Sequence, residues 1–250
     1  MKSVKSVSKN KSSLTSVTLV FKARSINITD SAESILMLIK FGVSGELRFL
    51  SHAETVKVFQ RACVRAGIEV QYSEGFNPRL KLSLPLPRSV GVESDDELLC
   101  IKVAKPSGDI SELCSLIKSG LGKELPAGIE LAGVDAAKGK VSFTAASARY
   151  ILAVRQEYAG KELKAKIEKL MASESFIIER YYEPGSSKFK RVDAREFIKS
   201  VTIQGGSVNV ECKISSAGSV RVDEILKVLG LKAWQLAEPV RRTNVVWQEN

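Results

Sequence analysis

Histidine is almost missing from this sequence, and the residue types that build metal centres are few and scattered. The 250 residues include one histidine, His52, and four cysteines, none of them in a Cys-x-x-Cys pair. Structural zinc sites and iron–sulfur clusters need closely spaced Cys or His ligands. The sequence therefore predicts no metal site and no cofactor. It also predicts that the cysteines are small core residues in a reducing, cytoplasmic compartment.

Long apolar runs and an excess of acidic residues are missing too. No stretch approaches the roughly 18 consecutive apolar residues of a membrane-spanning helix, so we expect no membrane partner. The chain has 38 Lys and Arg against 28 Asp and Glu, a net charge of +10. A basic surface attracts polyanions such as RNA, DNA or acidic lipid head groups. An ordinary basic protein without such a ligand stays open as the alternative.

The first 34 residues are basic and rich in Ser and Thr, with no acid before Asp30. Three interpretations compete, namely a transit peptide, a disordered basic arm, and an extension from an over-long gene start. The third interpretation has specific support, because Met37 stands just before Leu38-Ile39-Lys40-Phe41, where the folded domain is expected to begin. We expect residues 1–34 to be a disordered or artefactual basic extension, and whether 1–36 belong to the native protein stays open.

From residue 35 onward, apolar periodicity predicts two rounds of the same pattern. In the first round Ser51 and Glu54 form a capping-box signature, and the helix that they start ends at Gly67. One face of this helix is expected in the core, because apolar residues recur every three or four positions at Val56, Phe59, Ala62, Cys63 and Ala66. A second helix opens at Ser107 or Asp109 and ends near Gly120. The extended segments expected around these helices are 36–41, 47–50, 68–72, 80–86, 97–103 and 128–134.

The second round follows a linker of small residues, 135–147. Its expected strands are 149–155, 176–182, 189–192, 198–203, 208–214 and 237–247, and its expected helices are 161–172 and 222–229. Gly205-Gly206 is a strong hairpin signal. The predicted fold class is α+β, with two ferredoxin-like (βαββαβ) units in tandem, a first domain at 35–136 with the candidate site and a second at 147–250.

The helix after Ser51 is a candidate anion-binding element. Lys57, Arg61 and Arg65 recur every four residues, so they lie along one exposed stripe. Such a stripe can follow a phosphate backbone, although a solvated helix face explains it equally well. Four further cations in the same domain favour the anion site, namely Arg48, Arg79, Lys81 and Arg88.

His52 lies in the first turn of the same helix. A neutral imidazole beside phosphate-binding groups can act as a general base on a ribose 2′-hydroxyl. A structural role, in which His52 donates a hydrogen bond to a base or a loop carbonyl, stays open as the alternative.

The segment 72–79, Tyr-Ser-Glu-Gly-Phe-Asn-Pro-Arg, has the composition of a loop with one fixed shape. Gly75 permits a positive φ, and Pro78 keeps Asn77 extended. Tyr72 and Phe76 offer stacking surfaces for bases, and Asn77 and Arg79 offer hydrogen-bond donors. The alternative is a packed loop with Phe76 in the core. The turn at 90–94 is expected beside this loop, for function or for fold.

These segments resemble a known family. The strings RFLSHAE, FQRACVRAGI, YSEGFNPRLKLSL and LPRSVGVES are similar to the radical-SAM-linked domain of uncharacterised function (DUF2344 type) found in bacteria. The similarity is specific over 41–103 and weaker toward 241–243. It departs at Ala53-Glu54, where Leu-Asp is usual, and at Leu80, where proline is common. The residues on the pattern are Arg48, Ser51, His52, Arg61, Arg65, Ser73, Gly75, Phe76, Asn77, Pro78, Gly91, Glu93 and Ser94.

The resemblance implies a partner, a radical SAM protein with a cobalamin-binding domain, and a setting near ribosome and RNA-processing genes. This chain has no Cys-x3-Cys-x2-Cys motif, so it is not itself the radical enzyme. Our first hypothesis is an accessory RNA- or ribosome-binding module that works with such a partner. The second is a metal-independent endoribonuclease using His52, by analogy with the tandem ferredoxin-like ribonucleases that process CRISPR RNA. The third is a protein-interaction scaffold, and whether the protein is an enzyme stays open.

Overall fold

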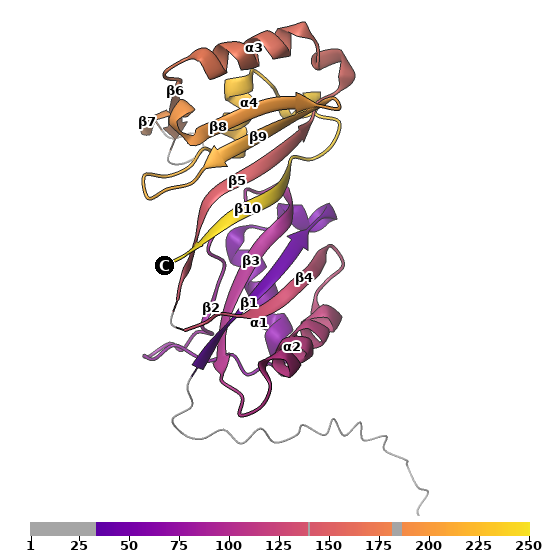
Figure 1. The fold of residues 1–250 in the computed structure, drawn as a ribbon, viewed down its shortest axis with the longest axis vertical. Helices are drawn as coiled ribbons and strands as arrows, with labels where there is room; N and C mark the ends of the chain where they lie inside the picture. Colours follow the sequence, from indigo (N-terminus) through magenta and orange to yellow (C-terminus); the bar gives the residue numbers. More distant parts are fainter. Residues whose placement is uncertain (1–33, 140, 182–186) are drawn as a thin grey trace, which may run out of the picture.

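A computed structural model describes residues 34–139, 141–181 and 187–250, as a mixed α+β fold with four α-helices in these residues (Figure 1). Residues 1–33 of the predicted basic extension, 1–34, lie outside the described residues, and Ser34 is the first residue of strand β1. The helices are α1 (His52–Arg65), α2 (Ile110–Glu124), α3 (Lys161–Ala172) and α4 (Val222–Leu229). The strands are β1 (Ser34–Val43), β2 (Leu82–Ser83), β3 (Glu93–Ala104), β4 (Ile129–Ala136), β5 (Phe143–Ala153), β6 (Ile177–Tyr181), β7 (Phe189–Asp193), β8 (Ile198–Gln204), β9 (Ser207–Lys213) and β10 (Arg241–Glu249).

One large sheet runs through both halves of the chain, in the order β4-β1-β3-β10-β5-β9-β8, with β2 paired to β3. Its strands pair antiparallel except at the junction of the halves, where Arg241 and Arg242 of β10 pair in parallel with Glu93 and Ser94 of β3. The last strand of the chain thus lies between the two halves (Figure 1). β6 and β7 form a separate two-stranded sheet.

Each half has its own apolar core. In the first half, alternate residues of β1 are buried beneath α1 and α2, and the ring of Phe41 meets that of Phe59 edge-on at 4.6 Å. In the second half, β5 and β9 bury Leu152 and Val210 among α3 and α4. Figure 1 shows α1 and α2 together at one end of the molecule and α3 and α4 at the other. The apolar periodicity of the helices therefore predicted most of the residues that face these cores, although Ile110 at the start of α2 is exposed.

The predicted helices are confirmed, and those at 161–172 and 222–229 have the observed bounds. The expected end at Gly120 is wrong, since α2 continues to Glu124. Gly120 lies against the end of α1, where a Cβ added to it would be 3.4 Å from the Cβ of Ala66.

Several predicted strands are wrong in extent. Residues 47–49 belong to a 3-10 helix, Gly45–Phe49, which begins at the positive φ of Gly45, 61°, and Leu50 alone is extended. Segment 68–72 forms only isolated β-bridges, at Val70 and Tyr72. Segment 80–86 contains only the two-residue strand β2, because Pro85 and Pro87 lack the backbone N–H groups that continued pairing needs. Conversely, β3 and β5 begin earlier than predicted, at Glu93 and Phe143, which shortens the linker.

No helix among the described residues is long and apolar enough to cross a membrane.

Candidate nucleic-acid interface

The start of α1 is fixed by the predicted capping box. The Ser51 hydroxyl accepts a hydrogen bond from the Glu54 backbone N–H, and the Glu54 carboxylate accepts one from the Ser51 backbone N–H at 2.9 Å. Hydrogen bonds from Ser51 also hold the pKa of Glu54 below its usual value. With this start, the helix turns Phe59, Ala62 and Cys63 into the core and leaves Arg61 and Arg65 exposed.

The loop after α1 is closed at its base by two reciprocal hydrogen bonds. The Ser73 backbone N–H donates to the Arg79 carbonyl at 2.7 Å, and the Arg79 backbone N–H donates to the Ser73 hydroxyl at 3.0 Å. Gly75 has a φ of 119°, which side-chain-bearing residues rarely adopt, so the prediction of a positive φ is confirmed. Tyr72 forms an isolated antiparallel β-bridge with Leu80, the residue that follows Arg79. Tyr72 and Arg79 therefore both lie at the base of the loop.

An open hollow of about 460 Å³ lies between the C-terminal half of α1 and the base of this loop. Its wall includes five residues predicted for binding or support, together with three that sequence reasoning did not single out. Arg61, Arg65, Tyr72, Pro78 and Arg79 are the predicted ones, and Gln60, Val64 and Leu80 are the others. The signal for Val64 was available, because an apolar residue on the charged face of an amphipathic helix is unusual.

The cations of the hollow differ in what they already bind. Arg65 donates to the Glu124 carboxylate at 2.9 Å and to the Glu124 carbonyl at 2.7 Å. In contrast, the exposed side chains of Arg61 and Arg79 have no hydrogen-bond or ion-pair partner among the described residues. None of the described residues that line the hollow is acidic. The hollow therefore offers two uncompensated guanidinium groups to an anion.

Three predicted residues, Lys57, Phe76 and Asn77, do not line the hollow. The loop tip is exposed, and Phe76 is fully exposed, so the alternative that Phe76 plugs the core is wrong. Asn77 is exposed beside it. Lys57 lies one helical turn before Arg61 on the exposed face of α1, which extends the cationic row beyond the hollow.

His52 is not part of this hollow. It is exposed at the first turn of α1 and borders a much smaller space of about 10 Å³, with Thr55, Arg88 and Glu97. Arg61 lies nine positions after His52 in the helix, which is about 14 Å along the helix axis. The structure therefore does not bring the candidate general base together with the free arginines.

Arg48 and Arg88 hold neighbouring turns in place. The Arg48 guanidinium donates to the Gly45 carbonyl at 2.7 Å and lies 4.2 Å from the Phe49 ring centre, so it is engaged within its own turn. Arg88 is buried, and it donates to the backbone carbonyls of Leu47, Arg48, Leu50 and Val92. The prediction that Arg88 belongs to the anion site is therefore wrong. Its burial could not be read from nearby residues, because it depends on the distant turn at 45–50.

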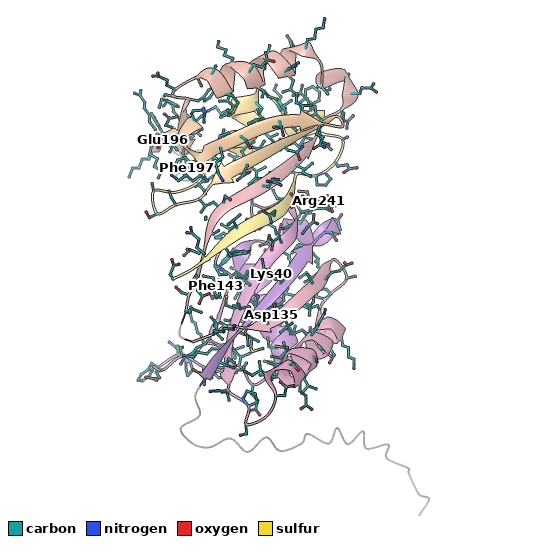
Figure 2. All side chains as sticks on the ribbon, viewed as in Figure 1. Lys40, Asp135, Phe143, Glu196, Phe197 and Arg241 are labelled. Carbon is teal, nitrogen blue, oxygen red and sulfur yellow. The ribbon has the colours of Figure 1, made fainter. Side chains whose placement is uncertain are left out.

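The segment Val-Gly-Val-Glu-Ser lies at the junction of the two halves. Gly91 turns the chain with a φ of 84°. The Glu93 carboxylate accepts hydrogen bonds from the Gly45 backbone N–H at 3.0 Å and from Arg241 at 2.8 Å, and the Ser94 hydroxyl donates to the Arg242 carbonyl at 3.3 Å. Figure 2 labels Arg241 at the level where the halves meet. These residues support the fold and lie apart from the hollow.

In the part of the chain that the structure describes, no group of three or more His, Cys, Asp and Glu side chains could hold a metal ion. All four cysteines are free, and Cys114 is the one that is not buried.

The fold and the hollow define a mixed α+β protein with an open cationic and aromatic hollow between a capped helix and a fixed loop. The chain belongs to a bacterial protein family whose description is "Uncharacterized protein conserved in bacteria (DUF2344)", and residues 37–224 match it. A comparison with curated proteins finds no match. The matched range contains the whole hollow and ends within α4.

Proposed function

We propose that this protein is an accessory module that binds RNA, free or within the ribosome, through the hollow between α1 and the loop at 72–80. The observation that supports the proposal best is the pair of uncompensated guanidinium groups, Arg61 and Arg79, beside the exposed ring of Tyr72. Guanidinium groups match phosphate geometry through paired N–H donors, and aromatic rings stack on bases. The net charge of +10 adds a long-range attraction for a polyanion.

The scaffold that we infer for this function is a tandem of two ferredoxin-like units. Two observations support it. In the first half the strand order is β4-β1-β3-β2, and in the second half it is β10-β5-β9-β8, with antiparallel pairing within each. The second unit carries the β6–β7 hairpin as an insertion. In such a tandem the hollow belongs to the first unit, and the second unit is free to contact a partner.

The partner that we propose is a radical SAM protein with a cobalamin-binding domain, and the setting is the cytoplasm. The family resemblance of the sequence motifs supports this partner, and the free cysteines fit a reducing compartment. Anaerobic purification of the tagged chain from a bacterium that encodes both proteins tests it. Recovery of a stoichiometric radical SAM protein is the expected result, and recovery of the chain with RNA alone would contradict it.

The salt dependence of RNA binding tests the RNA-binding role. Fluorescence anisotropy with a labelled RNA gives the affinity at several salt concentrations. Each phosphate contact to single-stranded RNA contributes about 0.7 to the slope of log affinity against log salt. We expect Arg61→Gln/Arg79→Gln to flatten this slope by about one to one and a half.

The matched control is Lys190→Gln/Arg191→Gln, which removes the same charge from exposed positions of β7 in the other half. We expect the control to keep the slope of the unmodified chain. Absence of RNA binding, or equal effects of the two double variants, would contradict the proposed function.

A further inference from the structure

The hollow has the chemistry of a site for one nucleotide and not for a duplex. Its apolar surface comes from Val64, Pro78 and Leu80, and the ring of Tyr72 stands beside them. Arg61 and Arg79 are the cations without a protein partner. We infer that the ligand is single-stranded RNA, with one unpaired base stacked on Tyr72 and the flanking phosphates bound by Arg61 and Arg79. This inference rests on the proposed RNA-binding function and names its substrate class.

The size of the hollow agrees with a single nucleotide. Pockets for small ligands have volumes of about 300–1,000 Å³, and this hollow has about 460 Å³. An A-form duplex keeps its bases stacked inside and presents phosphates and a shallow minor groove. A duplex laid over the hollow would therefore contact the arginines but leave the apolar wall facing water.

Exposed apolar surface favours the unpaired base. Val64 is 63% exposed and Tyr72 is 56% exposed, although both border a hollow with further apolar residues. A planar base that enters the hollow would remove this surface from water, which is favourable in proportion to the apolar area buried. Phe76 at the loop tip is fully exposed and offers a second ring to the next base of a flexible strand.

The site is largely ordered before any ligand arrives. Two hydrogen bonds between Ser73 and Arg79 close the loop base, and the pair between Arg65 and Glu124 fixes the far wall against α2. A preformed site loses little conformational entropy on binding, so the cost of ordering offsets little of the favourable free energy of stacking. The exposed side chains of Arg61 and Arg79 are the groups that become ordered when they bind the phosphates.

Anisotropy measurements on one RNA sequence in two forms test the inference. The probe is a 12-nucleotide unstructured RNA, used alone and annealed to its complement at the same salt concentration. We expect the single strand to bind at least tenfold more tightly. We expect Tyr72→Ala to weaken single-strand binding about 5- to 100-fold with an unchanged salt slope, the range found for loss of a stacking aromatic. Tyr72→Phe, which keeps the ring, should bind like the unmodified chain.

The outcomes separate this inference from the proposed function. Equal affinity for the two forms, or an equal effect of Tyr72→Ala on both, would overturn the single-strand inference while the RNA-binding function stands. Absence of binding to either form would overturn both. Since the Tyr72 side chain is half-exposed, Tyr72→Ala should fold, and its thermal unfolding by circular dichroism checks this.

Discussion

Arg242 and Glu97 form a buried ion pair that joins the last strand of the chain to the third. The guanidinium group of Arg242 on β10 donates a hydrogen bond to the Glu97 carboxylate on β3, and the two side chains are 2% and 6% exposed. Burial alone would lower the pKa of Arg242, but Glu97 and Tyr150 outweigh it and leave this pKa raised. The pair lies where the sheets of the two halves become continuous, so it holds the second half against the first.

The first prediction concerns this pair. Arg242→Met leaves the Glu97 carboxylate buried without its main partner, and we expect the free energy of unfolding to fall by roughly 3–5 kcal/mol. The double variant Arg242→Met/Glu97→Leu removes both charges and should lose clearly less than the sum of the two single variants. Urea unfolding of the four chains measures this coupling, and strictly additive losses would contradict it.

The second prediction separates His52 from the RNA site. Since His52 borders a different space from the hollow, His52→Ala should change the dissociation constant for RNA by no more than about twofold. The endoribonuclease hypothesis instead requires metal-independent cleavage of RNA that His52→Ala abolishes. A gel assay of RNA cleavage by both chains in the presence of a chelator decides between the two.

The third prediction concerns pH. Burial alone would raise the pKa of Glu224, but the paired hydrogen bonds from Arg180, each of 2.6 Å, and one from the Arg221 backbone leave it below its usual value. A carboxyl group whose pKa is lowered by folding stabilises the protein above its unfolded pKa, and this stability is lost as pH falls.

Glu224→Gln should therefore be less stable than the unmodified chain at pH 7, and the difference should shrink as the pH is lowered below about 5. Urea unfolding midpoints at pH 7, 5 and 4 measure this difference. Two curves that stay parallel over this range would contradict a lowered pKa of Glu224.

The fourth prediction uses the thiols to test the packing. Burial raises the pKa of Cys63 and of Cys100 to about 11, and that of Cys212 to about 12. These three thiols should therefore be protonated and protected at pH 8, and Cys114 alone is not buried. A disulfide reagent should modify at most one thiol rapidly in the native chain and all four in denaturant. Rapid modification of two or more native thiols would show that the cores are not packed as described.

The elements that could be predicted from the sequence are those whose signals are local. The capping box of Ser51 and Glu54, the apolar face with Phe59 and the hairpin at Gly205-Gly206 each lie within a few residues of the element that they define. In contrast, the burial of Arg242 depends on β10 pairing with a strand that is far away in the sequence. No local pattern distinguishes Arg242 from its exposed neighbour Arg241.

The candidate site could be predicted in part. The spacing of Arg61 and Arg65 and the turn chemistry of Gly75 and Pro78 correctly indicated a cationic helix beside a fixed loop. The expectation that His52 lies beside the phosphate-binding groups failed because His52 stands at the first turn of α1 and Arg61 stands near its end. The rise per residue of a helix already implied that distance. The partner that engages Arg65 could not be predicted, since Glu124 comes from α2, which is far from Arg65 in the sequence.

Crosslinking to RNA is the most direct test of the account. Irradiation of the full chain with a 4-thiouridine-labelled single-stranded RNA, followed by trypsin digestion and mass spectrometry, identifies the residues that contact bases. We expect crosslinks in the peptide 66–79, at Tyr72 or Phe76, and their loss in the Arg61→Gln/Arg79→Gln variant. Crosslinks confined to residues 141–250, or crosslinks at Tyr72 that persist in that variant, would contradict the account.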